Sequence, residues 1–328
     1  MDPFLSAGDA KDMLSIAQSF GSFGTYADEG TSDTLGEELP QRFDAGINYF
    51  KQGLDGKGTS DAPEVAASRT NYFRETYAYG NDIKAPGIEP FLEHPELSRT
   101  AKAISGCSNV VPAIVYANLL IPGQELAIHT DVPEFRGANR KVVPQWLLVV
   151  MLHSGLFEKW RIPIVTCVSW FGDAKGGAFT FYPEGANGKR SAISAQHNSA
   201  ILIDTDMTFH GVERVAGRLP DLALIGKKTR LHFCGETTWE LRESKEVIDT
   251  FSWSDIRYSI SWKAYCFADD EAEALWESGI DTLSSTDIIG TLEAALRVRG
   301  LLKVARPNPT ELALLLVDTF VKYPTAAH

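Results

Sequence analysis

The feature that most constrains the fold is a series of short apolar segments in the middle of the chain, from about residue 109 to residue 267. These segments are rich in Val, Ile, Phe, Trp and Thr and are separated by Gly, Pro and Asn, a pattern typical of strands joined by turns. No long helical segments alternate with them, so an antiparallel sandwich or jelly roll is favoured over a parallel sheet. The predicted strands cover residues 111–121, 125–131, 145–153, 163–171, 176–183, 199–204, 210–215, 230–236 and 255–267.

Helical periodicity dominates on both sides of this β-rich core. Residues 1–108 are predicted to form a mostly helical N-terminal layer with a loop near residues 52–63. Within that layer, Pro95 suits a first helical turn and Gly106 suits a C-terminal cap. Residues 268–328 are predicted to form C-terminal α-helices that pack on the outside of the barrel, with a homodimer contact through these helices as the alternative. We therefore expect a single domain, residues 1–328, whose core at 109–267 is mainly β.

Composition excludes several classes of partner. The formal net charge is −12 and no dense run of Lys and Arg occurs, so a nucleic-acid-binding surface is not expected. The longest unbroken apolar stretch, residues 146–152, is far shorter than the roughly 20 residues of a membrane-spanning helix. The acidic start of the chain lacks the pattern of a secretory signal, which favours a cytoplasmic protein. The motifs GxGxxG, GxxxxGK[ST], HExxH and GxSxG are also missing.

A candidate metal site begins with His129 and Asp131, two residues apart at the end of a predicted strand. Side chains at i and i+2 of a strand point the same way, so both can reach one ion. Two histidines and one carboxylate on one face of an octahedron suit Fe(II) and leave the opposite positions open. The third ligand must come from elsewhere in the chain. His210, which follows an apolar strand and a turn, is the best-placed candidate, and His232 is the second choice.

The order of these motifs resembles that of the Fe(II)/2-oxoglutarate-dependent dioxygenase superfamily. The resemblance covers roughly residues 77–267. Within the superfamily, the chain is more faintly similar to fungal oxygenases of secondary metabolism. It rests on a short series of motifs: the Pro-Gly turn at 122–123, HTD at 129–131, GGAFTFYP at 176–183, FHGVERV at 209–215 and RYSISW at 257–262. The resemblance implies a double-stranded β-helix, also called a jelly roll or cupin-like fold, with iron held by His129, Asp131 and His210.

The resemblance also implies a basic residue late in the barrel that pairs with the distal carboxylate of 2-oxoglutarate, often with Ser or Thr two residues later. Arg257 and Ser259 match this pattern, and the planar fork of Arg suits a carboxylate. Arg257 lies further beyond His210 than is usual in the family, and an insertion at about residues 216–251 accounts for the extra length. Arg230 and Arg218 remain competitors for the same role.

On the strand before the metal motif, Tyr116, Asn118 and Leu120 share one face. Asn118 is a candidate contact to 2-oxoglutarate or to the substrate, and a cross-strand hydrogen bond is the structural alternative.

The substrate pocket is expected near the residues that follow the metal motif and the arginine. The candidates that come from these segments and from the 176–183 strand are Val132, Phe135, Arg136, Phe179, Phe181, Ile260 and Trp262. Arg136 can hold a substrate carboxylate, which favours an amino acid or another small acid.

The function implied by the resemblance is that of an oxidoreductase that uses Fe(II), 2-oxoglutarate and O2. It would oxidise a C–H bond of an amino acid or secondary-metabolite intermediate by hydroxylation, desaturation or cyclisation, with release of succinate and CO2. Because the same barrel and ligands can host other chemistry, the alternative is a cupin-like metalloenzyme that does not use 2-oxoglutarate, such as an isomerase or a cofactor-independent dioxygenase.

Overall fold

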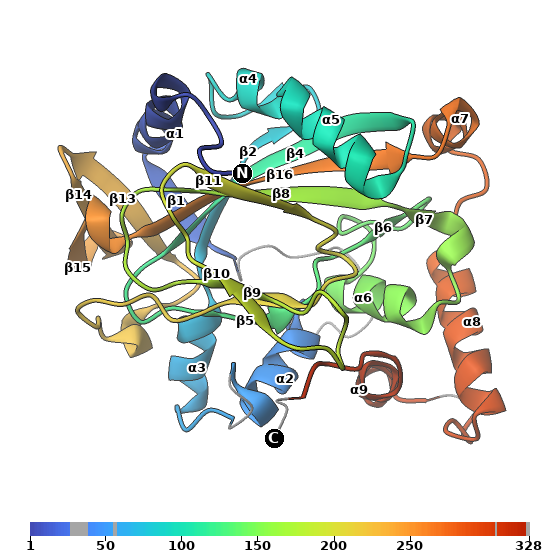
Figure 1. Cartoon of the computed structure of the whole chain (residues 1–328). Coiled ribbons are helices and arrows are strands. Elements are labelled where there is room, and N and C mark those ends of the chain that lie inside the picture. The colour runs from blue at the N-terminus through green and yellow to red at the C-terminus, as the bar shows by residue number, and fades with distance from the viewer. Residues whose placement is uncertain (27–38, 55–57, 306, 326–328) are drawn as a thin grey trace.

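Two antiparallel sheets form the centre of the computed structural model, which describes residues 1–26, 39–54, 58–305 and 307–325 (Figure 1). Within those residues the large sheet has ten strands, in the order β11 (Ser199–Ile203), β8 (Ile164–Phe171), β16 (Arg257–Phe267), β4 (Asn109–Leu120), β2 (Phe73–Tyr79), β1 (Ser22–Thr25), β13 (Thr229–Gly235), β14 (Thr238–Glu243) and β15 (Glu246–Ser252), with β3 (Asp82–Ile83) beside β2. The small sheet has the order β10 (Ser191–Ile193), β9 (Phe179–Phe181), β12 (His210–Val212) and β5 (Leu126–His129). A further pair joins β6 (Glu134–Phe135) to β7 (Arg161–Ile162).

The chain passes back and forth between the two sheets. It runs from β4 in the large sheet to β5 in the small one, then to β8, to β9 and β10, to β11, to β12 and finally to β16. Four strands of the large sheet thereby face the four strands of the small sheet, which is the topology of a double-stranded β-helix. The predicted fold class is confirmed.

Strands outside this eight-stranded core widen the large sheet. β1, β2 and β3 come from residues 1–108, a segment predicted as mostly helical, and β2 pairs directly with β4. The predicted insertion at 216–251 contains the meander β13, β14 and β15, which pairs with β1 rather than with the barrel. This meander lies between His210 and Arg257 in the sequence and accounts for much of the separation between them.

One predicted strand is wrong. Residues 145–153 lie in α6 (Gln145–Ser154), all of whose residues from Gln145 to Leu152 are buried. A continuous apolar run has neither the period of a strand nor that of an amphipathic helix, so periodicity alone does not separate a buried strand from a buried helix.

The helices lie in three groups (Figure 1). The outer face of the large sheet is covered by α1 (Ala7–Phe20), α4 (Glu89–Leu92) and α5 (Pro95–Ser105), while α2 (Phe43–Gln52) and α3 (Pro63–Thr70) pack beside β5. The third group comprises α6, α8 (Ser285–Val298) and α9 (Pro309–Phe320), and α7 (Asp270–Ser278) follows β16. Short 3-10 turns occupy Glu158–Trp160, Leu222–Leu224 and Trp253–Asp255. Among the described residues, no helix combines the length and the apolar character needed to cross a membrane.

The helix ends follow the predicted chemistry. Pro95 opens α5 and Gly106 ends it in a left-handed conformation with φ of 70°. A side-chain cap begins α9, where Asn308 accepts hydrogen bonds from the backbone N–H groups of Thr310 and Glu311.

The apolar face of α9 is buried within the chain. Leu312, Leu316 and Phe320 belong to the cluster that includes α6 and α8, so the C-terminal helices pack on the rest of the molecule. A homodimer contact through them stays a prediction. Of the predicted loop at 52–63, residues 55–57 lie outside the described part of the chain.

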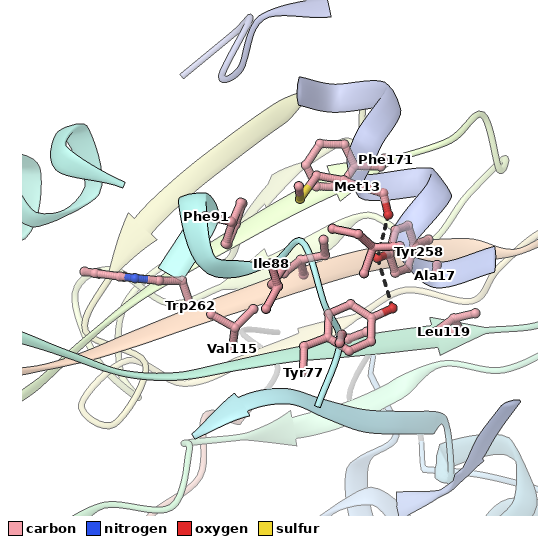
Figure 2. Close-up of a cluster of buried hydrophobic side chains, with 14 of the residues drawn as sticks. Met13, Ala17, Tyr77, Ile88, Phe91, Val115, Leu119, Phe171, Tyr258 and Trp262 are labelled. Atoms are coloured by element: carbon pink, nitrogen blue, oxygen red, sulfur yellow. Dashed lines mark hydrogen bonds between the residues drawn. The ribbon is translucent and has the colours of Figure 1, made fainter. Parts of the chain in front are cut away.

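The side chains of β16 divide between two faces of the large sheet, and one face packs in the core between this sheet and its covering helices. Figure 2 shows Tyr258 and Trp262 in this core; the Tyr258 hydroxyl donates to the backbone oxygen of Met13 at 3.1 Å and lies 3.2 Å from the Tyr77 hydroxyl. The indole N–H of Trp262 donates to the backbone oxygen of Leu92 at 2.7 Å. Because side chains alternate along a strand, the odd-numbered residues from 257 to 263 face the space between the two sheets.

Candidate metal centre and its cavity

Three of the predicted ligands converge between the sheets. His129 ends β5 and His210 begins β12, and the two are direct cross-strand partners. Asp131 follows two residues after His129, with Oδ1 3.5 Å from Nε2 of His129 and 3.6 Å from Nε2 of His210. The potential ligand atoms of the three residues all lie within 4.8 Å of one another. Two nitrogen donors and one oxygen donor in this arrangement fit an Fe(II) ion with open coordination positions.

Each histidine is oriented by a carbonyl of its own strand. Nδ1 of His129 lies 2.7 Å from the backbone oxygen of Ala127, and Nδ1 of His210 lies 2.8 Å from that of Thr208. A carbonyl oxygen only accepts a hydrogen bond, so Nδ1 carries the proton in both rings. The lone pair of each Nε2 is then free to bind a metal ion held between the three residues. Burial, and then the charge of His210, lowers the pKa of His129 to about 4. His129 is therefore neutral, as metal binding requires.

The second oxygen of Asp131 is held by groups that the sequence did not single out. Its Oδ2 accepts a hydrogen bond from the Thr205 hydroxyl at 2.7 Å and lies 2.7 Å from Nζ of the buried Lys263. Burial alone would raise the pKa of Asp131, but the charge of Lys263 holds this pKa well below its usual range. Asp131 is thus an ionised carboxylate with Oδ1 directed at the histidines.

Lys263 also approaches a second carboxylate. Its Nζ lies 3.6 Å from Oδ1 of Asp206, which is completely buried. Burial raises the pKa of Asp206 to about 6, against the opposing charge of Lys263. One buried cation therefore lies between the metal-site carboxylate and a second acid.

The metal cluster opens onto a cavity of about 160 Å³ between the sheets. Arg257 and Ser259, both on β16, line this cavity, and the side chain of Arg257 is buried. Nε of Arg257 donates to the backbone oxygen of Gly177 at 2.7 Å and Nη1 donates to the Ser259 hydroxyl at 3.3 Å, but Nη2 has no hydrogen-bond partner among the described residues. Burial lowers the pKa of Arg257 to about 9. A buried guanidinium with an unsatisfied donor in a cavity is a site for a ligand carboxylate.

Asn118 faces the same cavity. It pairs in register with Ser259 on β16. Within the described ranges its buried Oδ1 has no hydrogen-bond partner, so this atom does not make the alternative cross-strand hydrogen bond. Tyr116 and Leu120 also line the cavity, as their shared parity predicted. Of the predicted substrate residues, Val132 and Phe179 line the cavity, whereas Phe181 stacks on Phe179 without lining it.

Four of the predicted substrate residues lie elsewhere. Ile260 and Trp262 point into the core beneath the helices, because their parity on β16 is opposite to that of Arg257. Phe135 is buried with α6 and the C-terminal helices. Arg136 pairs with Asp281 at 3.1 Å on the outside of that cluster. The prediction of these four residues as pocket residues is corrected.

The competing candidates make their contacts outside the metal cluster. His232 and Arg230 lie on β13 in the outer meander, where Arg230 pairs with Glu75 at 2.8 Å. Arg218 pairs with Asp249 in the same region. None of the three lines the cavity formed by the described residues.

Several cavity residues were missed by sequence reasoning. They come mainly from the N-terminal layer and from β16, and they are Tyr26, Arg42, Thr70, Tyr72, Arg74, Arg140, Thr205, Ser261 and Lys263. The period of two that placed Arg257 and Ser259 inside would also have found Ser261 and Lys263. Nothing in the sequence pattern of residues 1–108 indicated that β1 and β2 join the barrel sheet.

Several solved structures are similar to this chain at low sequence identity. They include an oxidoreductase of the 2OG-Fe(II) oxygenase family from Burkholderia pseudomallei, with 10% identity, 60% of this chain and 69% of that chain covered and a TM-score of 0.35. A prolyl-4-hydroxylase from Pseudomonas putida matches with 12% identity, 81% and 100% coverage and a TM-score of 0.33. HygX from Streptomyces hygroscopicus, with nickel, 2-oxoglutarate and hygromycin B bound, matches with 9% identity, 80% coverage of each chain and a TM-score of 0.38. No protein-family model and no curated protein matches the chain.

Proposed function

We propose that this chain is a Fe(II)/2-oxoglutarate-dependent oxygenase that oxidises a C–H bond of a small molecule. One observation carries the proposal: the cluster of His129, Asp131 and His210 and the buried guanidinium of Arg257 open onto the same cavity, in which Nη2 of Arg257 has no hydrogen-bond partner from the part of the chain that the structure describes. A metal cluster with open positions and a separate carboxylate receptor are the two parts that a bound keto acid requires.

Each part has an assigned role in the protein. His129, Asp131 and His210 hold Fe(II), which supplies the activation of O2 coupled to conversion of 2-oxoglutarate into succinate and CO2. Arg257 binds the distal carboxylate, and Ser259 supports the guanidinium through its hydroxyl. Asn118, beside Ser259, offers an amide to the keto acid or to the substrate. Each hydrogen bond to a charged group contributes about 1.5–3 kcal/mol to binding.

The fate of the substrate depends on placement. The cavity walls decide which C–H bond lies near the metal and how far the site is shielded from water. The proposed substrate is an amino acid or a secondary-metabolite intermediate, which the enzyme would hydroxylate, desaturate or cyclise in this cavity.

The alternative is a cupin-like metalloenzyme that does not use 2-oxoglutarate. Such an enzyme has no need for an enclosed guanidinium in its cavity. Burial of Arg257 is unfavourable for its charge, as the lowered pKa of about 9 indicates, and a carboxylate ligand would offset this. The proposal therefore rests on Arg257 as much as on the metal ligands.

The proposal is tested by anaerobic addition of Fe(II) and then 2-oxoglutarate. We expect a weak visible charge-transfer band from the chelate and, under O2, formation of succinate. Arg257→Met should weaken 2-oxoglutarate binding roughly 10- to 100-fold while metal affinity is kept. Arg230→Met, in the outer meander, is the matched control and should change neither.

Binding of Fe(II) with no band and no succinate would favour the alternative class. If Arg230→Met weakens 2-oxoglutarate binding and Arg257→Met does not, the assignment of the carboxylate receptor is wrong.

A further inference from the structure

One face of helix α2 forms part of the cavity wall. Arg42, Ala45 and Gly46 line the cavity and are spaced at i, i+3 and i+4, so they lie on the same side of the helix. The helix packs against β5, and Ala45 shares a buried cluster with Ala127, two residues before the proposed metal ligand His129. This face of α2 therefore borders the cavity beside the strand that carries a metal ligand.

Neither the backbone conformation nor the packing around Gly46 requires a glycine. Gly46 lies inside α2 and is not one of the glycines with positive φ, so an L-residue can adopt its conformation. A Cβ added at Gly46 would meet no atom of the described residues within 4 Å. Glycine in a helix also destabilises it relative to alanine. The missing side chain thus leaves open space in the cavity at a cost in helix stability.

The same cavity has an apolar wall. Its members line the cavity and pack together in one cluster, and they are Tyr26, Tyr72, Leu120, Leu126 and Val212. The rings of Tyr26 and Tyr72 stack with centroids 5.2 Å apart and planes inclined by 14°. Apolar surface that lines a cavity favours an apolar group of a ligand, because contact removes both surfaces from water.

The charged side chain at the start of α2 is compensated within the protein. Nε and Nη2 of Arg42 donate to the two carboxylate oxygens of the buried Asp44, at 3.0 and 3.1 Å. Nη2 of Arg42 also donates to the backbone oxygen of Thr130 at 3.0 Å. Arg42 therefore adds no uncompensated charge to the face of α2 on which Gly46 lies.

We propose that Gly46 is a specificity-determining residue of the oxygenase, whose missing side chain keeps space in the cavity for an uncharged apolar group of the substrate. The group would lie between the cavity face of α2 and the apolar wall. This inference rests on the proposed function and specifies one feature of its substrate. A side chain at position 46 would occupy the space that the group needs, so the size of the residue there limits the size of the group.

The test uses full-length protein loaded anaerobically with Fe(II) and saturating 2-oxoglutarate. The probes are cyclohexanol, a small neutral apolar ring, and myo-inositol, which has the same ring with a hydroxyl on every carbon. Binding is followed by calorimetry and by the shift of the visible chelate band. The wild type should bind cyclohexanol, and it should bind inositol at least about 10-fold more weakly, because the hydroxyls of inositol would lose water in an apolar space.

Two substitutions at Gly46 fill the space to different extents. Gly46→Ala adds a methyl group and Gly46→Leu adds a branched side chain, and both variants should form the chelate band as the wild type does. Gly46→Leu should weaken cyclohexanol binding at least about 10-fold, with Gly46→Ala intermediate, because the added atoms occupy the space of the probe.

Gly290→Leu is the matched control. Gly290 lies inside α8, a Cβ there would also meet no described atom within 4 Å, and Gly290 is not one of the described residues that line the cavity. The control variant should therefore bind cyclohexanol as the wild type does.

Thermal unfolding separates a role of Gly46 in specificity from a role in the fold. Gly46→Ala and Gly290→Ala should each raise Tm by about 1–2 °C, because each replaces a glycine inside a helix. We expect Gly46→Ala to combine a higher Tm with weaker cyclohexanol binding. A lower Tm in Gly46→Ala alone would mean that the fold requires this glycine, and it would overturn the proposal.

The other outcomes separate this proposal from the proposed function. Absence of the chelate band in the wild type contradicts the oxygenase function. A normal band overturns the role of Gly46 alone if the wild type binds no cyclohexanol, or binds inositol equally well. Unchanged cyclohexanol binding in Gly46→Leu, or an equal loss in Gly290→Leu, overturns it as well. Loss of the band in both Gly46 variants would place the keto acid, and not the substrate, beside α2 and would also overturn it.

Discussion

Nζ of Lys263 lies 2.7 Å from Oδ2 of Asp131, so the carboxylate of the metal cluster is shared between two roles. Oδ2 is held by Lys263 and by the Thr205 hydroxyl, and Oδ1 is left to face the two histidines. Lys263 therefore orients Asp131 for binding through one oxygen, and it compensates a buried negative charge when no metal is bound. It is a positioning residue rather than a catalytic one.

Lys263→Met should destabilise the metal-free protein more than the metal-loaded protein. Removal of one partner from a buried ion pair costs about 3–5 kcal/mol, and here Asp131 and Asp206 would both lose their cation. A divalent ion would restore positive charge beside Asp131. Unfolding measured in EDTA and in Ni(II) should therefore show a larger metal-induced stabilisation in the variant than in the wild type.

A second variant distinguishes this electrostatic role from packing. Lys263→Met combined with Asp206→Asn should recover part of the lost stability, because one of the two uncompensated acids is removed. An equal loss of stability with and without metal would mean that Lys263 acts only through packing.

Variants of the three proposed metal ligands should lose metal binding and activity, whereas a variant of His232 should keep both. His129→Ala, Asp131→Ala and His210→Ala should each abolish succinate formation and lower Ni(II) affinity, because the ligand atoms of these residues converge. His232→Ala should retain both properties, since His232 lies on β13 in the outer meander. Calorimetric titration with Ni(II) checks metal binding independently of turnover. Loss of Ni(II) binding in His232→Ala would contradict the ligand set.

How far sequence reasoning reached is clearest on β16. The motif that placed Arg257 and Ser259 in the cavity was right about their face, but Ile260 and Trp262 were assigned to the same pocket although alternation puts them on the opposite face. The same alternation would have found Lys263. The alternation of side chains along β16 therefore predicts more of the cavity lining than the motif does by itself.

The remainder depends on tertiary structure. Arg74 reaches the cavity only because β2 pairs with β4, more than 30 positions further along the chain, and no local pattern specifies that pairing. α6 was predicted as a strand because its apolar run has no period, and only its burial on all sides explains that run. The barrel strands were predictable because each carries its own turn signals.

Acid should destabilise the metal-free protein partly through His153. This ring lies 3.2 Å from the Thr130 hydroxyl and stacks on Phe209, and burial lowers its pKa to about 4. An unfolded histidine takes up its proton near pH 6.5. The unfolded chain therefore binds more protons between about pH 6.5 and pH 4, and the free energy of unfolding falls as pH is lowered through that window.

His153→Gln removes this contribution while keeping a side chain that can reach Thr130. Between pH 7.5 and pH 4.5 the free energy of unfolding of the variant should fall by about 2 kcal/mol less than that of the wild type. Urea unfolding in EDTA at both pH values provides the measurement. Parallel pH dependence in the two proteins would show that His153 titrates normally.

Gly177 supports the carboxylate receptor through its lack of a side chain. Its backbone oxygen accepts the hydrogen bond from Nε of Arg257, and a Cβ added at this glycine would lie 2.5 Å from Cδ of Arg257. Gly177→Ala should therefore displace the guanidinium and weaken 2-oxoglutarate binding at least about 10-fold, while Ni(II) affinity is unchanged.

Gly185→Ala is the matched control for that substitution. Both glycines have positive φ, 63° at Gly177 and 78° at Gly185, so both variants carry a backbone penalty of about 1 kcal/mol. A Cβ at Gly185 would meet nothing within 4 Å. If both variants lose stability to a similar extent but only Gly177→Ala loses 2-oxoglutarate affinity, the effect comes from the displaced arginine. Equal loss of affinity in both would instead mean that backbone strain, and not the contact with Arg257, controls the receptor.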